Sequence, residues 1–195
     1  MHRTLLVSSM TGLALWMLTA CGGSTATLEI MDAPPAGVTA VSLFVGSMDV
    51  HVVDDDEAKD ADPNDVSIDE DGQWESLQVN KAIDLAAHQG EGAAATLGEL
   101  DLPAGKITQV RLTLDANQPN TVTDDQGICN IDMGMVSPTG IKINHVFKAF
   151  ASGDDPMILV DFDLGKSLKV SGACYRLEPV LKLFKVRADG EDLAL

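Results

Sequence analysis

The chain has 195 residues, of which 30 are acidic and 13 are lysine or arginine, so its formal net charge is −17 at pH 7. A surface this negative repels nucleic acids and anionic lipid headgroups, which argues against both as partners. The length suits one domain with a sizeable core, and the charge favours solubility or the binding of cations.

The chain begins with the pattern of a bacterial export signal. Met1-His2-Arg3 is short and basic, and the apolar run after it is shorter than the roughly 18 residues that a membrane-spanning helix needs. The run ends at Leu18-Thr19-Ala20-Cys21, which resembles the lipobox of bacterial lipoproteins, whose cysteine becomes the first mature residue and carries the lipid. We therefore expect residues 1–20 to be a signal peptide and residues 21–25 to be a lipidated cysteine with a short tether.

Lipidation at Cys21 predicts a location in the cell envelope. Acyl chains on this residue would hold the protein at the bilayer, because each buried methylene contributes about 0.8 kcal/mol. In lipoproteins of this kind an aspartate after the cysteine commonly marks retention in the inner membrane, and Gly22 stands there instead. We therefore expect a lipid anchor in the outer membrane. An unlipidated secreted protein is the alternative.

Apolar residues alternate with a period of two after the tether, which predicts β-strands. The alternation predicts strands over residues 26–31, 41–52, 74–79 and 93–102, with one or two helical turns within 80–89. In the second strand the apolar residues change parity at Gly46-Ser47, where a β-bulge would return them to the same face.

An acidic segment, residues 54–72, interrupts this pattern. It holds ten acidic residues against Lys59 and is predicted to be an exposed loop between strands. Calcium binds six to eight oxygen ligands, which clustered carboxylates supply. The candidate calcium ligands are Asp60, Asp62, Asp69 and Asp71, although their spacing matches an EF-hand loop poorly. The loop is therefore either a solvated segment or a calcium site.

The second half of the chain predicts strands over residues 110–114, 158–164 and 175–186. The last of these has apolar residues at both odd and even positions, as in a strand that is covered on both faces. Arg111, Asp161 and Asp163 lie opposite the apolar positions of their strands. They are therefore expected to form either an exposed ion pair or a recessed polar cluster that recognises a ligand.

Once Cys21 is assigned to the lipid, Cys129 and Cys174 are the remaining cysteines. In an oxidising periplasm two such residues are expected to form a disulfide. A metal site or a reactive thiol is the alternative.

Other residues with chemical potential favour structural roles. Asp49 and His51 share one strand face and are expected to be a surface pair, while Trp74 and Tyr175 fit core or strand-edge packing. The histidines lack metalloprotease spacing, and the sequence contains no G-x-S-x-G elbow, phosphate-binding loop or dinucleotide fingerprint. We therefore expect a protein that is not an enzyme.

Several segments in order carry a family resemblance: "ATLEIMDAP", "VSLFVGSMDVH", "LPAGKITQVRLTL", "ILVDFDLGKSL" and "YRLEPVLK". Together they resemble the bacterial lipoprotein family known as domain of unknown function 4382. The resemblance covers nearly all of residues 26–186 and implies a surface or periplasmic β-sandwich without an established activity. The acidic segment and the cysteine pair are not implied by it.

The sequence thus predicts an all-β fold, an antiparallel β-sandwich of immunoglobulin-like or prealbumin-like type with at most one short helix. Residues 26–195 are expected to form a single domain. The expected role is a non-catalytic binding, adhesion or structural module, whose partner is an envelope protein or polysaccharide. The alternatives are a calcium-dependent binding protein that uses residues 54–72, and an enzyme without a recognisable motif.

Overall fold

The computed structural model describes residues 23–32, 34–53, 72–188 and 191–192. In this part of the chain the strands are β1 (Gly23–Met31), β2 (Val38–Val53), β3 (Gln73–Asp84), β4 (Ala95–Pro103), β5 (Gly105–Leu114), β6 (Thr121–Asp124), β7 (Gly127–Asn130), β8 (Ile141–Phe150), β9 (Met157–Phe162), β10 (Leu168–Ser171), β11 (Cys174–Leu177), β12 (Leu181–Ala188) and β13 (Glu191–Asp192). One short α-helix, α2 (Leu164–Ser167), and two 3-10 turns, η2 (Leu85–Ala87) and η3 (Glu91–Ala93), accompany them.

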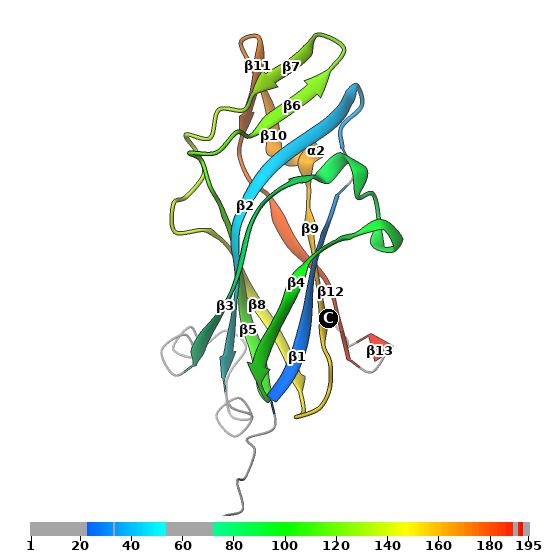
Figure 1. Cartoon of the computed structure of the whole chain (residues 1–195), viewed down its shortest axis with the longest axis vertical. Helices are drawn as coiled ribbons and strands as arrows, with labels where there is room; N and C mark the ends of the chain where they lie inside the picture. The colour runs from blue at the N-terminus through cyan, green and yellow to red at the C-terminus, as the bar shows by residue number, and fades with distance from the viewer. Residues whose placement is uncertain (1–22, 33, 54–71, 189–190, 193–195) are drawn as a thin grey trace, which may run out of the picture.

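Two sheets pack against each other along the long axis of the molecule (Figure 1). One has the strand order β13-β12-β9-β1-β4, and the other has the order β7-β6-β2-β5-β8, with β3 also paired to β2. The strands β10 and β11 form a small third sheet at one end. The predicted all-β sandwich with one short helix is confirmed.

The predicted bulge in β2 explains how one strand keeps its apolar residues on one face. The pairing of β2 with both β3 and β5 shifts register between Val45 and Ser47. In the pair with β5, Val45 faces Leu114 and Ser47 faces Thr113, so Gly46 is the extra residue of β2 there. This shift turns the apolar residues on both sides of the bulge into the same core, as the sequence predicts. The buried residues are Val41, Leu43, Val45, Met48, Val50 and Val52.

One pair of strands departs from the antiparallel prediction. Strands β1 and β9 run parallel, with Leu28 opposite Ile158 and Ile30 opposite Val160. Parallel neighbours need a long crossover between them. Here the chain leaves β1, forms the second sheet and also β4 on the other side of β1, and returns to lie beside β1 in the same direction.

The prediction of one strand over residues 175–186 is wrong, because this segment changes sheets. Strand β11 pairs with β10, the backbone then bends at Glu178-Pro179-Val180, and β12 pairs with β9. Leu177 of β11 and Leu181 and Leu183 of β12 face the core from odd positions, and the change to Val186 falls at the register shift between Leu183 and Lys185 within β12. Within 80–89, β3 continues to Asp84, and the single 3-10 turn η2 follows as one of the helical turns expected there.

Strand β1 starts earlier than expected, so the predicted tether is partly folded. Gly23, Ser24 and Thr25 pair with the last residues of β4 instead of linking the body to Cys21. The hydrophobic core extends from Ala26 to Val186, so a chain that begins at Gly22 keeps all of it. Within the described ranges, no helix has the length and apolar character needed to cross a membrane.

Candidate functional site

A cluster of polar side chains lies on the outer face of three neighbouring strands, β3, β2 and β5. The strand register places Ser76, Asp49 and Arg111 in one row across these strands. It places Trp74, His51 and Gln109 in the next row. Side chains in such rows contact their cross-strand neighbours, so strand pairing itself assembles the cluster.

Asp49 and Arg111 form its charged centre. The Nε of Arg111 donates a hydrogen bond to Oδ2 of Asp49 at 2.9 Å, and the hydroxyl of Ser76 donates to Oδ1 at 2.6 Å. The guanidinium of Arg111 also lies 4.3 Å from the centre of the Trp74 ring, a cation–π contact. Only 9% of the Asp49 side chain and 26% of the Arg111 side chain are exposed. The ion pair is therefore largely removed from water.

His51 lies deeper in the same cluster and is only 1% exposed. Its Nδ1 is 2.6 Å from the Thr108 hydroxyl, and its ring centre is 4.9 Å from that of Trp74. Gly72 presses on the ring, because a Cβ built on this glycine would lie 2.4 Å from Cε1 of His51. The expectation of a surface Asp49–His51 pair is therefore wrong. Residues of the neighbouring strands contact both side chains, and Gly72 lies against His51.

The three residues predicted to form a polar cluster are not brought together. Arg111 lies on β5 in one sheet, whereas Asp161 lies on β9 in the other sheet and pairs with Lys182 at 2.8 Å. Asp163 pairs with Lys166 at 2.6 Å and accepts a hydrogen bond from the Lys166 backbone at the start of α2. The alternation of apolar residues indicated that these three side chains point away from the core. It did not indicate which sheet each strand joins.

The two ion pairs shift the pKa values of Asp163 and Lys182 in the directions that opposite charges favour. The hydrogen bond from Lys166 lowers the pKa of Asp163 below its usual value. The hydrogen bond to Asp161 raises the pKa of Lys182. Both pairs lie near water and hold the local backbone, so neither forms a recessed ligand site.

The start of α2 is held by a second carboxylate that the sequence interpretation did not single out. The buried Asp32, at the end of β1, accepts a hydrogen bond from the backbone N–H of Leu164 at 2.9 Å. Free N–H groups at a helix start are satisfied by such carboxylates. Asp32 thus fixes α2 to the five-stranded sheet, which contains β1.

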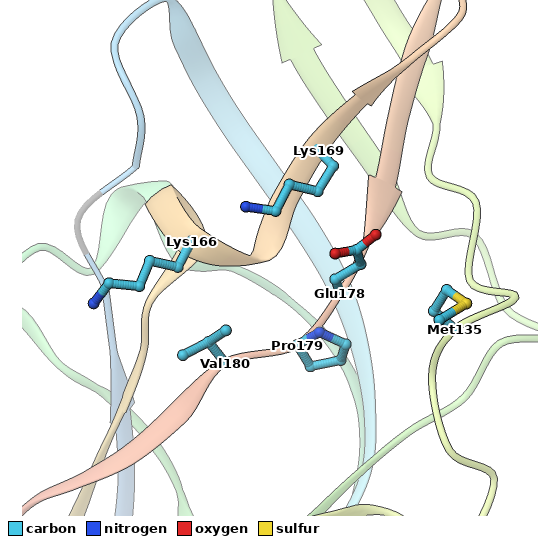
Figure 2. Close-up of a pocket in the computed structure, with 6 residues that line it drawn as sticks. All are labelled: Met135, Lys166, Lys169, Glu178, Pro179 and Val180. Carbon is cyan, nitrogen blue, oxygen red and sulfur yellow. The ribbon is translucent and has the colours of Figure 1, made fainter.

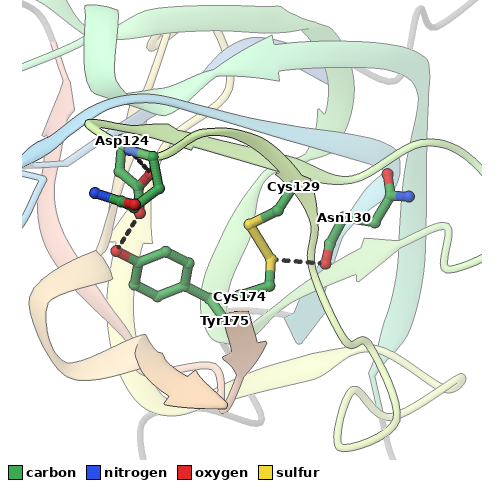
Figure 3. The surroundings of a disulfide bond; sticks show 6 residues. Asp124, Cys129, Asn130, Cys174 and Tyr175 are labelled. Atoms are coloured by element: carbon green, nitrogen blue, oxygen red, sulfur yellow. Dashed lines mark hydrogen bonds between the residues drawn. A yellow bond between two sulfur atoms is a disulfide. The ribbon is translucent and has the colours of Figure 1, made fainter. Parts of the chain in front are cut away.

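The predicted disulfide is confirmed. Cys129 of β7 and Cys174 of β11 are bonded, and the neighbouring Tyr175 donates a hydrogen bond from its hydroxyl to Asp124 of β6 at 3.0 Å (Figure 3). This hydrogen bond raises the pKa of Tyr175. The two links join the β6–β7 and β10–β11 hairpins into one unit, which we call the hairpin end.

The hairpin end exposes large apolar side chains to water. Ile128 of β7 is 75% exposed and Val170 of β10 is 80% exposed. Figure 1 shows both hairpins at one end of the long axis, opposite the start of β1. Apolar side chains held in water by a rigid frame are characteristic of interaction surfaces when they cluster.

A pocket of about 560 Å³ lies where α2 and β10 meet the bend after β11. Its lining residues are Met135, Lys166, Lys169, Glu178, Pro179 and Val180. Figure 2 shows the two lysine side chains extending in the same direction, with Pro179 and Val180 beside them. The pocket thus combines cationic groups with an apolar wall, a composition that small-ligand sites share.

Two predicted sites fall outside the described residues. These are the lipidation site Cys21 and the calcium candidates Asp60, Asp62, Asp69 and Asp71. Within the described part of the chain, no group of three or more histidine, cysteine, aspartate or glutamate side chains is arranged to hold a metal ion.

Two segments that carry the family resemblance meet in the polar cluster of β3, β2 and β5. Asp49 and His51 come from "VSLFVGSMDVH", and Thr108 and Arg111 come from "LPAGKITQVRLTL". No curated protein is significantly similar to this chain. The sequence matches the family described as "Domain of unknown function (DUF4382)" over residues 23–179. Because this match covers most of the chain, the protein belongs to the DUF4382 family.

Proposed function

We propose that this protein is a lipid-anchored, non-catalytic module of the bacterial outer membrane, which binds a partner protein of the cell envelope through its hairpin end. Cys21 carries the lipid in this proposal, and the sandwich acts as a rigid body between anchor and partner. The hairpin end is its binding surface.

The position of the first folded residue carries the proposal. Strand β1 begins at Gly23, two residues after Cys21, and two residues span at most about 7 Å. Figure 1 places this start at one end of the long axis and the hairpin end at the other. A lipid on Cys21 would therefore leave the hairpin end as the part of the body that points away from the membrane.

The chemistry of the hairpin end favours a protein partner. Ile128 and Val170 offer apolar surface, and the disulfide and the Tyr175–Asp124 hydrogen bond hold both hairpins in place. A rigid surface loses less entropy when it binds, which strengthens association.

A structural role for the polar cluster supports a non-catalytic function. The Asp49 carboxylate already accepts hydrogen bonds from Arg111 and Ser76, and His51 contacts Thr108 within a buried environment. These groups link three strands to one another. The hydrogen bonds of these groups therefore stabilise the fold.

The anchor is tested by replacing Cys21 with serine in cells and separating membrane from soluble fractions. We expect the wild type in the outer membrane and Cys21→Ser outside it, with loss of the incorporated fatty-acid label. A variant with both Cys129 and Cys174 changed to serine is the matched control and should keep the label. Equal fractionation of Cys21→Ser and wild type would contradict the anchor.

The binding surface is tested with a photo-crosslinking amino acid placed at Val170, at the hairpin end. The control position is Glu99, an exposed residue of β4 in the half that contains Gly23. We expect discrete protein adducts from position 170 and none from position 99. Identical patterns from the two positions would refute a binding role for the hairpin end.

A further inference from the structure

We propose that the pocket between α2 and the β11–β12 bend binds the carboxyl-terminal residue of a peptide chain. Lys166 and Lys169 hold the carboxylate, while Pro179, Val180 and Met135 contact the side chain. This inference rests on the proposed function, because it names the chemistry that the protein recognises in its partner.

The charge around Lys169 is the first argument. This lysine lies directly opposite Arg176 in the β10–β11 pair, where like charges repel each other. Arg176 pairs with Glu178 and Lys166 pairs with Asp163, whereas no carboxylate among the described residues pairs with Lys169. The pocket therefore has a local excess of positive charge.

That excess stands out in a chain with a net charge of −17. On β12, by contrast, Lys182 pairs with Asp161, and Lys185 and Arg187 both pair with Glu91. A cationic spot on a negative protein attracts a small anionic group and repels the cationic partners that the rest of the surface favours.

The apolar wall of the pocket is the second argument. Val180 and Met135 both expose much of their side chains to water, and Pro179 lies between them in the lining. Apolar surface of this kind is favourable to bury, at about 25 cal/mol for each Å² removed from water. An inorganic anion would neutralise the lysines but would leave the apolar wall exposed to water.

The frame of the pocket is fixed before a ligand arrives. Ser167, which is fully buried, accepts a hydrogen bond from the N–H of Val180 through its hydroxyl and one from the N–H of Glu178 through its carbonyl, both at 2.8 Å. These bonds hold α2 against the bend that forms the wall. A preorganised site loses less entropy when its ligand binds.

A carboxylate and an apolar side chain on one carbon atom are the defining features of a peptide's last residue. Capture of a terminal carboxylate is one of the recurring modes of peptide recognition. The pocket volume of about 560 Å³ suits a ligand of one or a few residues, since small-ligand pockets usually measure about 300–1,000 Å³. In the proposed orientation α2 and β10 lie in the half of the body farther from the bilayer (Figure 1), so a peptide reaches the pocket more readily than a lipid does.

The test uses the full chain in lipid nanodiscs and fluorescence anisotropy of two labelled tetrapeptides that end in leucine. One has a free terminal carboxylate and the other has a terminal amide. We expect the acid to bind about tenfold more tightly than the amide, which a charge-assisted hydrogen bond supplies. Lys169→Gln should remove this difference, and Lys166→Gln should reduce it.

Lys142→Gln is the matched control, because Lys142 is also an exposed lysine on a β-strand and lies outside the pocket. It should leave the difference between acid and amide unchanged. Circular dichroism should show that all three variants melt like the wild type. Equal affinities of acid and amide, or equal losses in all three variants, would overturn the proposal.

Competition separates the peptide from other anions. N-acetyl-leucine should displace the labelled acid at lower concentrations than glucuronate or inorganic phosphate does, because it alone also covers the apolar wall. Displacement at equal concentrations would overturn recognition of a peptide terminus. Crosslinks from position 170 would persist in that case, so the failure of this inference is distinguishable from failure of the proposed function.

Discussion

Replacing Arg111 with methionine should destabilise the fold more than breaking a surface ion pair does. Methionine keeps most of the apolar stem but removes the Arg111 donor, and the Asp49 carboxylate, of which 9% is exposed, keeps the hydrogen bond from the Ser76 hydroxyl at 2.6 Å. It also removes the cation–π contact with Trp74. The variant thus leaves the buried negative charge of Asp49 without its ion-pair partner.

The magnitude follows from the burial of this pair. Breaking a fully buried ion pair costs about 3–5 kcal/mol, whereas an exposed pair contributes about 0–1 kcal/mol. Because a quarter of the Arg111 side chain is exposed, at 26%, the expected cost lies between these limits, near 2 kcal/mol. For a domain of this size that lowers the melting temperature by about 4–8 °C.

Urea unfolding followed by circular dichroism measures the free energy of unfolding in a double-mutant cycle with Asp49→Asn. The coupling between the two changes should exceed about 1 kcal/mol, since the double variant no longer leaves a buried charge. Lys182→Met is the control, because it breaks the Lys182–Asp161 pair, in which 59% of the lysine side chain is exposed. If Arg111→Met costs no more than Lys182→Met, the reasoning about burial is refuted.

Three further predictions concern packing, the disulfide and pH. Gly72→Ala should cost about 1–3 kcal/mol, because its Cβ would lie 2.4 Å from the His51 ring, while Gly92→Ala, which meets no atom within 4 Å, should cost less in the same urea titrations. Reduction of the disulfide, which closes a loop with a sequence separation of 45, should lower stability by on the order of 2–4 kcal/mol, as thermal melts with and without reductant would show. Lys185 and, after it, Arg187 lower the pKa of Asp192, so this carboxylate stabilises the fold above its unfolded pKa of about 3.9 and less so as the pH falls through its folded value. Asp192→Asn should therefore reduce the loss of stability that thermal melts show between about pH 5 and pH 2. The same dependence of melting temperature on pH in the variant and the wild type would contradict the prediction.

The local features of this chain could be predicted because they depend on neighbours in sequence. The alternation of Val41, Leu43 and Val45 predicts a strand, and the change of parity at Gly46 predicts the bulge that the structure contains. The disulfide followed from the number of cysteines and the expected compartment.

The segment from Tyr175 to Val186 shows where sequence patterns stop being sufficient. Apolar residues on both parities occur in a strand covered on both faces, and also in a segment that bends and joins a second sheet. The second arrangement also leaves Val180 and Phe184 exposed, at 39% and 36%. The pairing of β11 with β10 and of β12 with β9 decides between them, and Pro179 in the bend was the available signal.

The candidate site could not be predicted from the sequence for a related reason. Asp49 and His51 were correctly placed opposite the core, but their burial depends on Trp74, Gly72 and Arg111, which come from other segments. In the same way, Lys166 and Lys169 meet Val180 only because α2 is hydrogen-bonded to the bend.

By itself, the sequence determined that the fold is a β-sandwich, where β2 bulges, and which cysteines pair. Only the tertiary structure decided that Arg111 meets Asp49 and not Asp161, and that two lysines share a pocket with an apolar wall. The physical reason is the separation along the sequence of the residues that determine each feature. Backbone alternation is set by residues one or two positions apart, whereas pairing partners are chosen by how the whole set of strands buries its apolar faces together.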